Sequence, residues 1–483
     1  MTRGDQVSDE RAPLLSDSDD GRDVGELLTF DESDSGDPRQ WSYGAKMRNI
    51  ATIATMSILA PVASSMFTPG VHQIAESLGT QVTTVVGCTT GFVTMLGIGP
   101  LILAPLSESF GRRTLYLLCF TMFTLMQIPS ALSPNIGTLI AMRTLSGFFG
   151  SVGIANGGGS ISDMFEPGSR ASIYGWYLLG PLLGPTLGPA LGGIIVQRLG
   201  WRWIFWTLFI VCAINTFCGF FLLRESYGPV ILARRRRKLE NSSGSTYRIE
   251  GEDTRPVWDK TFHSLRRPLK ILIQPIVLIM STYQAIVFAT TYSIYTNMQS
   301  IFSGEYGFDT EQVGLAYLGP GLGFLFAVSF LVPRIDTVWN HLRERNDGKA
   351  RPEYRLPLAN IGAVFIPCAL FWFAWSVELR APWLVSVAAT FPYGIGQVMI
   401  LNCTSNYYID SFEKYAASAL AAGAMLRSVV GGIAPIFASA IFDTLGYGWG
   451  ISTFGFLALA LAPAPSFFFY YGASLREKYQ VEL

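Results

Sequence analysis

Apolar stretches of about 20 residues recur along most of the chain, separated by short polar segments. Because a helix of roughly 20 apolar residues crosses the hydrocarbon core of a bilayer, each stretch predicts a membrane-spanning helix. The stretches are continuous rather than alternating segments of about ten residues, which argues against a membrane β-barrel. The pattern predicts an all-α membrane protein with twelve spans, at residues 47–69, 84–106, 114–132, 137–160, 170–197, 203–223, 271–296, 313–333, 356–377, 382–403, 415–440 and 448–471.

The longest polar segment between spans lies between the sixth and the seventh and contains "ARRRRKLENSSGSTYRIEGEDTRP". Six spans, a basic linker and six further spans predict two six-helix bundles, an arrangement typical of transporters. We therefore expect an N-terminal bundle over residues 47–223, a basic linker over 224–270, a C-terminal bundle over 271–471 and a short tail over 472–483.

The first 46 residues are acidic, rich in Ser, Gly and Asp, and almost free of aromatic residues before Trp41. Such a composition buries too little apolar surface to fold alone, so residues 1–46 are predicted to be a disordered tail. No cleaved signal peptide is expected, because an apolar core is missing near the start. The whole chain of 483 residues is 50% hydrophobic and 14% charged. Soluble proteins carry about 25% charged residues, so the composition also favours a polytopic membrane protein.

Lysine and arginine gather on one side of the predicted membrane. The runs at Gly111–Arg113, Arg234–Lys238 and His341–Arg355 share that side, whereas the opposite loop Ser303–Gln312 carries no Lys or Arg. The positive-inside rule then places both termini in the cytosol. We expect a multi-pass protein of the plasma membrane. The acidic-dileucine pattern "ERAPLL" at Glu10–Leu15 leaves a vacuolar or endosomal membrane as the alternative.

No pattern in the chain predicts enzyme chemistry. The three histidines are scattered, and neither an HExxH motif nor a Gly-rich phosphate loop with its lysine occurs. The six cysteines form no CxxC and are interpreted as small buried apolar residues. We therefore expect no enzyme activity, no cofactor, no metal and no nucleic-acid partner. The expected partners of a monomeric chain are a small organic substrate, protons and the lipid bilayer.

The fifth span carries "GPTLGPALGG" at Gly184–Gly193. Gly184, Gly188 and Gly192 recur every four residues, so they share one helix face and allow a neighbouring helix to approach closely. The prolines with the same spacing remove backbone donors and should bend the helix; they are Pro181, Pro185 and Pro189. Ordinary packing of small residues is the alternative explanation of this spacing.

Charged residues mark the loop after the second span, "APLSESFGRR" at Ala104–Arg113. A tight glycine turn followed by Arg112 and Arg113 pins the loop to the cytosolic side. Glu108 is expected to lie against the positive N-terminal end of the eleventh span. Asp163, at the cytosolic end of the fourth span, is a candidate partner for either arginine.

Two further arginines fall inside apolar helices, where a guanidinium is costly and by default marks a functional position. Arg143 lies in the fourth span near its extracellular end, so extension of its side chain to the interface is the alternative. Arg427 lies deeper, in the eleventh span, and should face the central cavity or the interface between the halves. No central carboxylate is identified as the proton carrier, and Glu108 and Asp163 remain candidates.

These motifs resemble those of the major facilitator superfamily. The antiporter motif G-x-x-x-G-P-x-x-G-G of its drug:proton exporters is matched at Gly184, Gly188, Pro189, Gly192 and Gly193. The charged loop is similar to the superfamily pattern G-x-L-a-D-r-x-G-r-k, with departures at Ala104, Glu108 and Ser109, and Arg143 matches the arginine of R-x-x-q-G. The resemblance implies the twelve-span major facilitator fold and export by proton exchange. It also implies a role in proton coupling for Arg143. With the charged loop, its candidate partner and the second arginine inside an apolar helix, the candidate coupling or gating residues are Arg143, Glu108, Asp163, Arg112, Arg113 and Arg427.

Other stretches look like the fungal twelve-span drug:proton antiporter group, which includes multidrug, mycotoxin and polyamine exporters. They include "WSYGAK", "ESYGPVILARRRRKL" and "RPEYRLPLANIG", and the resemblance covers residues from about 41 to 477. Polyamine members carry an acidic residue in the seventh span, where this chain has Thr296. The resemblance therefore favours a neutral or weakly charged aromatic substrate over a polycation.

Spans seven, eight and ten combine large apolar faces with hydrogen-bonding tips, a composition that suits bulky amphipathic ligands. The candidate substrate-binding residues are Tyr283, Gln284, Tyr292, Tyr295, Asn297, Tyr317, Tyr393, Gln397 and Asn402. Packing or membrane-interface roles are the alternative for each. The expected function is proton-coupled antiport that exports a hydrophobic or amphipathic organic compound by alternating access. The alternative is a proton-independent facilitator, or a symporter, of a small organic nutrient or polyamine.

Overall fold

The computed structural model describes residues 26–30, 34, 36–165, 167–243, 247–249, 257–412 and 416–479. These residues are almost entirely helical, and eleven stretches among them are long and apolar enough to cross a membrane. The all-α fold class predicted from the sequence is confirmed.

The N-terminal bundle contains nine helices in the described chain, and it corresponds to the first six predicted spans. They are α1 (Tyr43–Ser65), α2 (Val71–Leu78), α3 (Val82–Phe110), α4 (Arg112–Leu125), α5 (Gln127–Ala131), α6 (Ile136–Gly150), α7 (Val152–Met164), α8 (Pro167–Leu199) and α9 (Arg202–Leu222). The aromatic side chains of Phe92, Phe120 and Phe123 are fully buried in its core.

The C-terminal bundle is built from α12 to α19. The elements are α12 (Pro275–Tyr306), α13 (Thr310–Ala316), α14 (Leu318–Phe326), the π-helical turn η3 (Ala327–Leu331), α15 (Val332–Arg345), the short η4 (Pro352–Arg355), α16 (Ala359–Glu378), α17 (Trp383–Ser411), α18 (Ala416–Leu461) and α19 (Ala464–Lys478). The elements from α13 to α15 follow one another and form one candidate span, Thr310–Arg345.

The twelve predicted spans and the eleven observed stretches differ in number because of the last stretch of the chain. The last candidate, Ser418–Lys478, is 61 residues long, about twice what a tilted span needs. Inside α18 the backbone of Gly446 has φ 72° and ψ 171°, which is not helical. Gly446 lies between the predicted spans 415–440 and 448–471, so this stretch contains both of them.

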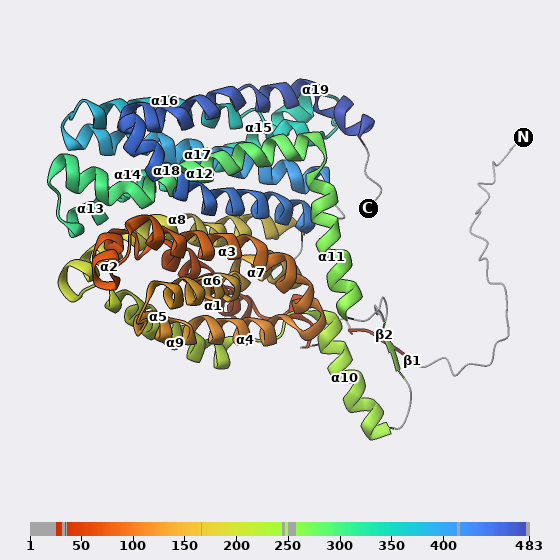
Figure 1. The fold of residues 1–483 in the computed structure, drawn as a ribbon. Helices are drawn as coiled ribbons and strands as arrows, with labels where there is room; N and C mark the ends of the chain where they lie inside the picture. The colour runs from red at the N-terminus through yellow and green to blue at the C-terminus, as the bar shows by residue number, and fades with distance from the viewer. Residues whose placement is uncertain are drawn as a thin grey trace, which may run out of the picture.

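Figure 1 shows the two bundles as two layers whose helices run in a common direction. One end of the layers carries the linker helices α10 (Gly228–Ser243) and α11 (Val257–Leu272), and the opposite end carries α2 and α13 (Figure 1). These ends are called the linker side and the far side below. Helices α3 and α8 of the first bundle face α18 and α13 of the second, so these four line the boundary between the halves.

Part of the segment predicted to be a disordered tail is structured. Strand β1 (Glu26–Leu28) pairs in parallel with β2 (Tyr247–Ile249), which lies in the linker. The short helix η1 (Pro38–Gln40) follows, and Asp34 forms an ion pair with Arg235 of α10. A backbone N–H from Gly36, together with Arg235, lowers the pKa of Asp34, so this carboxyl stays charged. The partners lie more than 200 residues apart, and tail composition alone could not reveal them.

Two of the six cysteines are not buried, which corrects the prediction made for all six. Cys218 on α9 and Cys368 on α16 are exposed, and all six are free thiols. A lipid-facing helix surface is as apolar as a core, so an apolar span does not distinguish the two environments.

The turn at Gly446 provides a test of where the eleventh span ends. Its φ and ψ fall in a region open almost only to glycine, so Gly446→Ala should destabilise the fold by about 1–3 kcal/mol. The thermal unfolding midpoint in detergent, followed by tryptophan fluorescence, should fall by about 2–5 °C. Gly304→Ala is the matched control, because Gly304 is helical and a Cβ there meets no atom within 4 Å. Equal midpoints for both variants would contradict a sharp turn at Gly446.

Candidate functional site

The two halves meet through helix pairs that approach almost backbone to backbone. Between α3 and α18, a Cβ added to Gly97 would overlap the Ser428 side chain, and one added to Gly432 would lie 2.7 Å from Thr94 Oγ1. Between α8 and α13, a Cβ on Gly314 would lie 2.7 Å from the carbonyl oxygen of Pro189. Glycine at these positions is therefore a condition for the observed approach.

Polar contacts join the halves on the far side. His72 Nε2 and Ser300 Oγ are 3.0 Å apart, and they connect α2 with α12. Arg198 of α8 contacts both carboxylate oxygens of Glu311 in α13, at 3.0 and 3.1 Å. His72 also lines a polar recess of about 390 Å³, together with Gln299 and Thr310 of the other half. The far side of the interface is therefore held together in this conformation.

The fifth-span glycines contact two different helices. A Cβ on Gly188 would lie 2.6 Å from the Val62 carbonyl oxygen and 3.0 Å from the Met66 nitrogen, both in or next to α1. Gly184 and Gly192 meet the same helix one turn away on either side, at Pro61 and at the Met66 carbonyl. The predicted close helix approach is confirmed, and the partner is α1 of the same bundle.

Gly193 faces the other half. A Cβ there would lie 2.5 Å from the Thr310 carbonyl oxygen and 3.1 Å from the Gly314 Cα. Helix α8 thus presents one small-residue face to α1 and another to α13. It remains a single helix, Pro167–Leu199, through its three internal prolines.

Arg427 lies at the boundary between the halves, as predicted. Its Nη1 donates to Gln284 Oε1 at 3.5 Å, and its guanidinium carbon lies 5.2 Å from the centre of the Phe288 ring, both on α12. The phenols of Tyr174, Tyr292 and Tyr408 lie within electrostatic range of the guanidinium. Tyr174 belongs to α8 in the N-terminal half, so the cluster draws side chains from both bundles.

Near Arg427, the buried amide nitrogen of Gln284 is a hydrogen-bond donor without a partner among the described groups. Tyr408 donates to the Val277 carbonyl at 3.1 Å and pairs with Ser281 Oγ at 2.7 Å, so its hydroxyl is satisfied. Tyr292 meets Ser64 Oγ of α1 at 3.4 Å. Gln284 is buried, and its Nε2 has no hydrogen-bond partner among the described groups.

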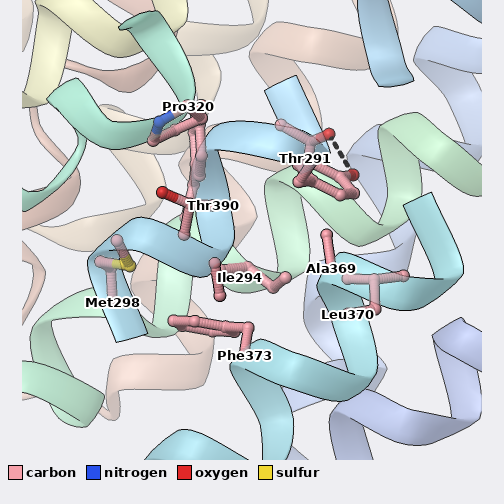
Figure 2. A pocket seen from close by; sticks show the side chains of 11 residues that line it. Thr291, Ile294, Met298, Pro320, Ala369, Leu370, Phe373 and Thr390 are labelled. Carbon is pink, nitrogen blue, oxygen red and sulfur yellow. Dashed lines mark hydrogen bonds between the residues drawn. The ribbon is translucent and has the colours of Figure 1, made fainter. Parts of the chain in front are cut away.

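Most of the other predicted substrate residues lie inside the C-terminal bundle. Tyr393 bonds Thr291 at 2.8 Å, Gln397 accepts from the same threonine at 3.2 Å, and Tyr317 donates to the Tyr295 carbonyl at 2.6 Å. Tyr283 is fully buried in the same core. Figure 2 shows the small cavity there, which Thr291, Ile294 and Phe373 help to line. Its volume is about 20 Å³, too small for an organic substrate.

The two predicted asparagines are engaged on the helices of the same bundle. Asn297 accepts from Ser439 at 3.2 Å, and Asn402 donates to the Val398 carbonyl of its own helix at 3.1 Å. Of the nine residues in the predicted substrate set, the structure therefore brings Gln284 and Tyr292 to Arg427.

Arg143 is completely buried in the N-terminal bundle, so its side chain does not extend to the membrane interface. Its Nη2 donates to the Ala63 carbonyl at 2.7 Å. Its guanidinium carbon lies 4.3 Å from the Phe92 ring centre and 4.8 Å from that of Phe67. A third ring, that of Phe205, lies 5.8 Å away, so three aromatic rings and one carbonyl oxygen surround the cation. Its Nε and Nη1 are buried without a hydrogen-bond partner among the described groups.

Arg112 organises a second charged cluster, on the linker side. Its Nε donates to Asp163 at 3.3 Å, which confirms the partner predicted from the sequence. Its backbone N–H donates to Glu225 at 2.8 Å, and its Nη1 donates to Ser107 at 2.5 Å. Glu108 lies 3.7 Å from Nη2 of the same guanidinium.

Two predictions about this loop have different outcomes. Arg113 points away from the cluster and donates to the Phe220 carbonyl of α9 at 2.9 Å. The eleventh span, whose start was predicted to receive Glu108, was predicted to begin at residue 415, and residues 413–415 lie outside the described residues. The contact of Glu108 with that helix end stays a prediction.

Three consecutive glycines in α7 make room for these side chains. A Cβ on Gly157 would overlap the Tyr177 hydroxyl, one on Gly158 would lie 3.3 Å from the Tyr174 ring, and one on Gly159 would lie 2.7 Å from an Arg112 nitrogen. The run "NGGGS" therefore positions both the linker-side cluster and an aromatic residue near Arg427.

The C-terminal half has its own linker-side cluster. Arg355 in η4 donates to Asp410 of α17 at 2.7 Å and also binds Asp336 of α15. Burial alone would lower the pKa of Arg355, but the two carboxylates outweigh it and raise the pKa above its ordinary value. Each half therefore anchors its linker-side loop through a carboxylate-paired arginine.

Sequence reasoning missed Tyr174, Tyr408 and Glu225. The tenth span was predicted to end at residue 403, but α17 continues to Ser411 and carries Tyr408 inward. Tyr174 and Tyr177 lie three residues apart and stack at 6.1 Å, a spacing that would have placed them on one face of the fifth span. Glu225 follows the sixth span and gave no local signal.

Comparison with known proteins agrees with this architecture. A family model described as Major Facilitator Superfamily matches residues 53–435. The chain is 37% identical over 453 residues to the MFS-type transporter tndD of Aspergillus flavipes, covering 92% of this chain and 84% of the relative. It is 36% identical over 457 residues to the efflux pump radE of Floropilus chiversii, covering 93% and 85%.

Solved structures show the same fold at low identity. The xylose transporter XylE from E. coli, in a partially occluded inward open conformation, superposes with a TM-score of 0.64 at 13% identity, covering 88% of this chain and 97% of the other. The human organic anion transporter MFSD10 gives 0.56 at 15% identity, covering 87% and 99%.

The α8–α1 contact predicts the effect of one substitution. Gly188→Val places a branched side chain against backbone atoms of Val62 and Met66, which cannot move aside as a flexible side chain could. Such overpacking costs about 1–3 kcal/mol or more. We expect the variant to reach its membrane but to transport at less than about a tenth of the wild-type rate, since 1.4 kcal/mol corresponds to a factor of ten. Transport is measured in reconstituted vesicles.

Gly304→Val controls for adding the same side chain to a helix, because a Cβ at Gly304 meets no atom within 4 Å. Wild-type transport by Gly188→Val would show that the glycine face is dispensable.

Proposed function

Since the chain belongs to the major facilitator superfamily and is a multi-pass membrane transporter, we propose that it is a proton-coupled antiporter. It exports a hydrophobic or amphipathic organic compound by alternating access. Relatives named as fungal efflux pumps and MFS-type transporters, which match over more than nine-tenths of this chain, support the export direction.

The observation that carries this proposal is the double contact of α8. Its glycines meet α1 in one bundle and α13 in the other, at separations that leave no room for a side chain or a water molecule. A seal made from backbone contacts prevents passive leakage while the halves rock. An exchanger needs that property, because an uncoupled leak would dissipate the proton gradient.

Alternating access follows from the contacts between the halves. The far side is closed here by the pairs His72–Ser300 and Arg198–Glu311. Rocking of one bundle against the other would break these pairs and open the residues around Arg427 to the far side. The linker side, rich in Lys and Arg, is the cytosolic side in this proposal. The plasma membrane is the proposed location, with a vacuolar or endosomal membrane as the alternative.

Proton coupling is proposed to act through the buried cations of the N-terminal bundle and the carboxylates beside them. A proton bound by Asp163 removes its negative charge and weakens its pair with Arg112, which holds the linker-side loop to Glu225. Arg143 lies farther inside the same bundle, against α1 and α3, where a shift in its ring contacts would move both helices. The proton thereby acts on contacts that set the position of the bundle.

The direct test uses purified protein in sealed vesicles with an imposed pH gradient. A small panel of fluorescent aromatic compounds, including acids, amides and cations, is presented, and substrate and proton movements are recorded together. We expect movement of substrate against its own gradient, with protons moving the opposite way. Movement only down the substrate gradient and indifferent to pH would contradict antiport and indicate a facilitator.

Arg143 provides a second prediction. Arg143→Ala and the similarly sized Arg143→Met both remove the charge held by Phe92 and Phe67, and Arg143→Met refills most of the space. Proton-driven transport should fall at least about tenfold, a loss of about 1.4 kcal/mol of coupling, while substrate exchange without a pH gradient persists.

Arg202→Met is the control for charge removal, because Arg202 lies at the exposed end of α9 on the far side. Undiminished proton-driven transport by Arg143→Met would reduce Arg143 to a packing residue.

A further inference from the structure

The positive charge of Arg427 has no negative partner in the described part of the chain. Arg112 and Arg355 both pair with carboxylates within 4 Å, whereas neither Arg143 nor Arg427 has such an ion pair among the described residues. Arg143 is completely buried, but Arg427 is partly exposed and lies between the bundles. The ionisable groups within electrostatic range of its guanidinium are the hydroxyls of Tyr174, Tyr292 and Tyr408, and a tyrosine hydroxyl carries no charge at physiological pH. A guanidinium kept inside a membrane span without a counter-charge is costly, so its retention points to a charge that arrives from outside the protein.

Hydrogen-bond donors exceed acceptors around this guanidinium. Among the described residues, the side-chain acceptor of Arg427 is Gln284 Oε1, at a long 3.5 Å. The Nε2 of the same glutamine is buried and has no partner among the described atoms. A ligand bound here must therefore supply acceptor oxygens, and a carboxylate matches the fork of a guanidinium.

Aromatic rings stand beside the charge. Phe288 lies under the guanidinium at 5.2 Å and packs on Tyr292 with ring centres 6.3 Å apart. On the other side of the boundary, Tyr174 and Tyr177 of α8 stack on each other in the N-terminal bundle. These rings can receive the apolar or aromatic body of a ligand while its acidic group meets Arg427.

The place of Arg427 fits a transport site. It lies eleven residues beyond the start of α18, about 16 Å along the helix at 1.5 Å per residue. Its side chain is partly exposed. Rings and polar groups from α8, α12 and α17 converge here, so a ligand at this point touches both halves.

We propose that Arg427 and Gln284 form the binding site for the negatively charged group of the exported compound, and that the substrates are amphipathic or aromatic organic acids. This narrows the proposed export function and rests on it. The sequence indicated a neutral or weakly charged aromatic substrate. The groups around Arg427 instead favour a substrate whose acidic group is ionised at physiological pH.

The proposal has a consequence for charge movement. Outward transfer of a monoanion in exchange for one inward proton moves two elementary charges in the same electrical direction. Exchange of a neutral compound for one proton moves a single charge. A membrane potential negative on the linker side therefore drives acid export more steeply than amide export.

The test compares 1-naphthaleneacetic acid with 1-naphthaleneacetamide, which share the ring system and differ in charge. Binding to the purified full-length protein in detergent is followed by quenching of tryptophan fluorescence at pH 7. We expect the wild type to bind the acid at least tenfold more tightly than the amide. Arg427→Gln should remove that preference while leaving amide binding within twofold, and Arg427→Lys should retain part of it.

Arg202→Gln is the matched control and should behave as the wild type. Equal binding of acid and amide by the wild type, or binding of neither at millimolar concentration, would overturn the proposal. Equal weakening of both ligands by Arg427→Gln would also overturn it, because that pattern indicates a structural role. If Arg427→Gln does not fold, the wild-type preference and Arg427→Lys decide.

Failure of the export proposal gives a different result. If the acid is preferred in detergent but its movement in vesicles ignores the pH gradient, the anion site stands and proton antiport fails. If the amide is exported against its gradient with proton exchange and the acid is not bound, antiport stands and the anion site fails.

Discussion

The backbone contact of α8 with helices on both of its sides is the constraint on which the rest of the structure depends. Gly184, Gly188 and Gly192 bring it against α1, and Gly193 brings it against α13 of the other half. Lipid supplies no hydrophobic force between helices, so close packing of small residues has to provide the attraction. Because one helix makes both contacts, a rocking of the halves cannot occur without a change along α8. The same helix places Tyr174 near Arg427. A movement of α8 therefore changes both its glycine contacts and the surroundings of Arg427.

Three buried or partly buried arginines differ in their partners, and the partners separate their roles. Arg112 is paired with Asp163 and held to Glu225 at the end of its bundle, where the pair fixes a loop. Arg143 is enclosed by aromatic rings and one carbonyl inside a bundle. Arg427 lies between the bundles with phenols, an amide and a phenyl ring, and with no carboxylate in the described chain. The first is a structural pair, the second responds to helix positions, and the third is left open to a ligand.

The sequence predicted what depends on local spacing and also the pair of Arg112 with Asp163, but it missed most other contacts between distant residues. The span positions follow from the length of the apolar stretches, and the glycine face of α8 follows from the four-residue spacing of its glycines. The structure has both. The break between the last two spans was predicted as well, and Gly446 supplies it. The directions in which the tyrosine side chains point could not be predicted from the sequence. Tyr283 and Tyr292 lie in the same apolar span, but only Tyr292 reaches the boundary between the halves. The pairing of β1 with β2, and of Arg112 with Glu225, joins residues too far apart for any pattern to connect them.

Alternating access requires the far-side contacts between the halves to open during transport, and a reversible cross-link across them tests this requirement directly. His72→Cys and Ser300→Cys place two thiols where side chains now meet at 3.0 Å, and a short bifunctional methanethiosulfonate can join them. We expect vesicle transport to stop when the link forms, to return when a reductant cleaves it, and to be unaffected by the reagent in a variant that carries only one of the two substitutions. Full transport by a population shown to be cross-linked would contradict alternating access through this interface.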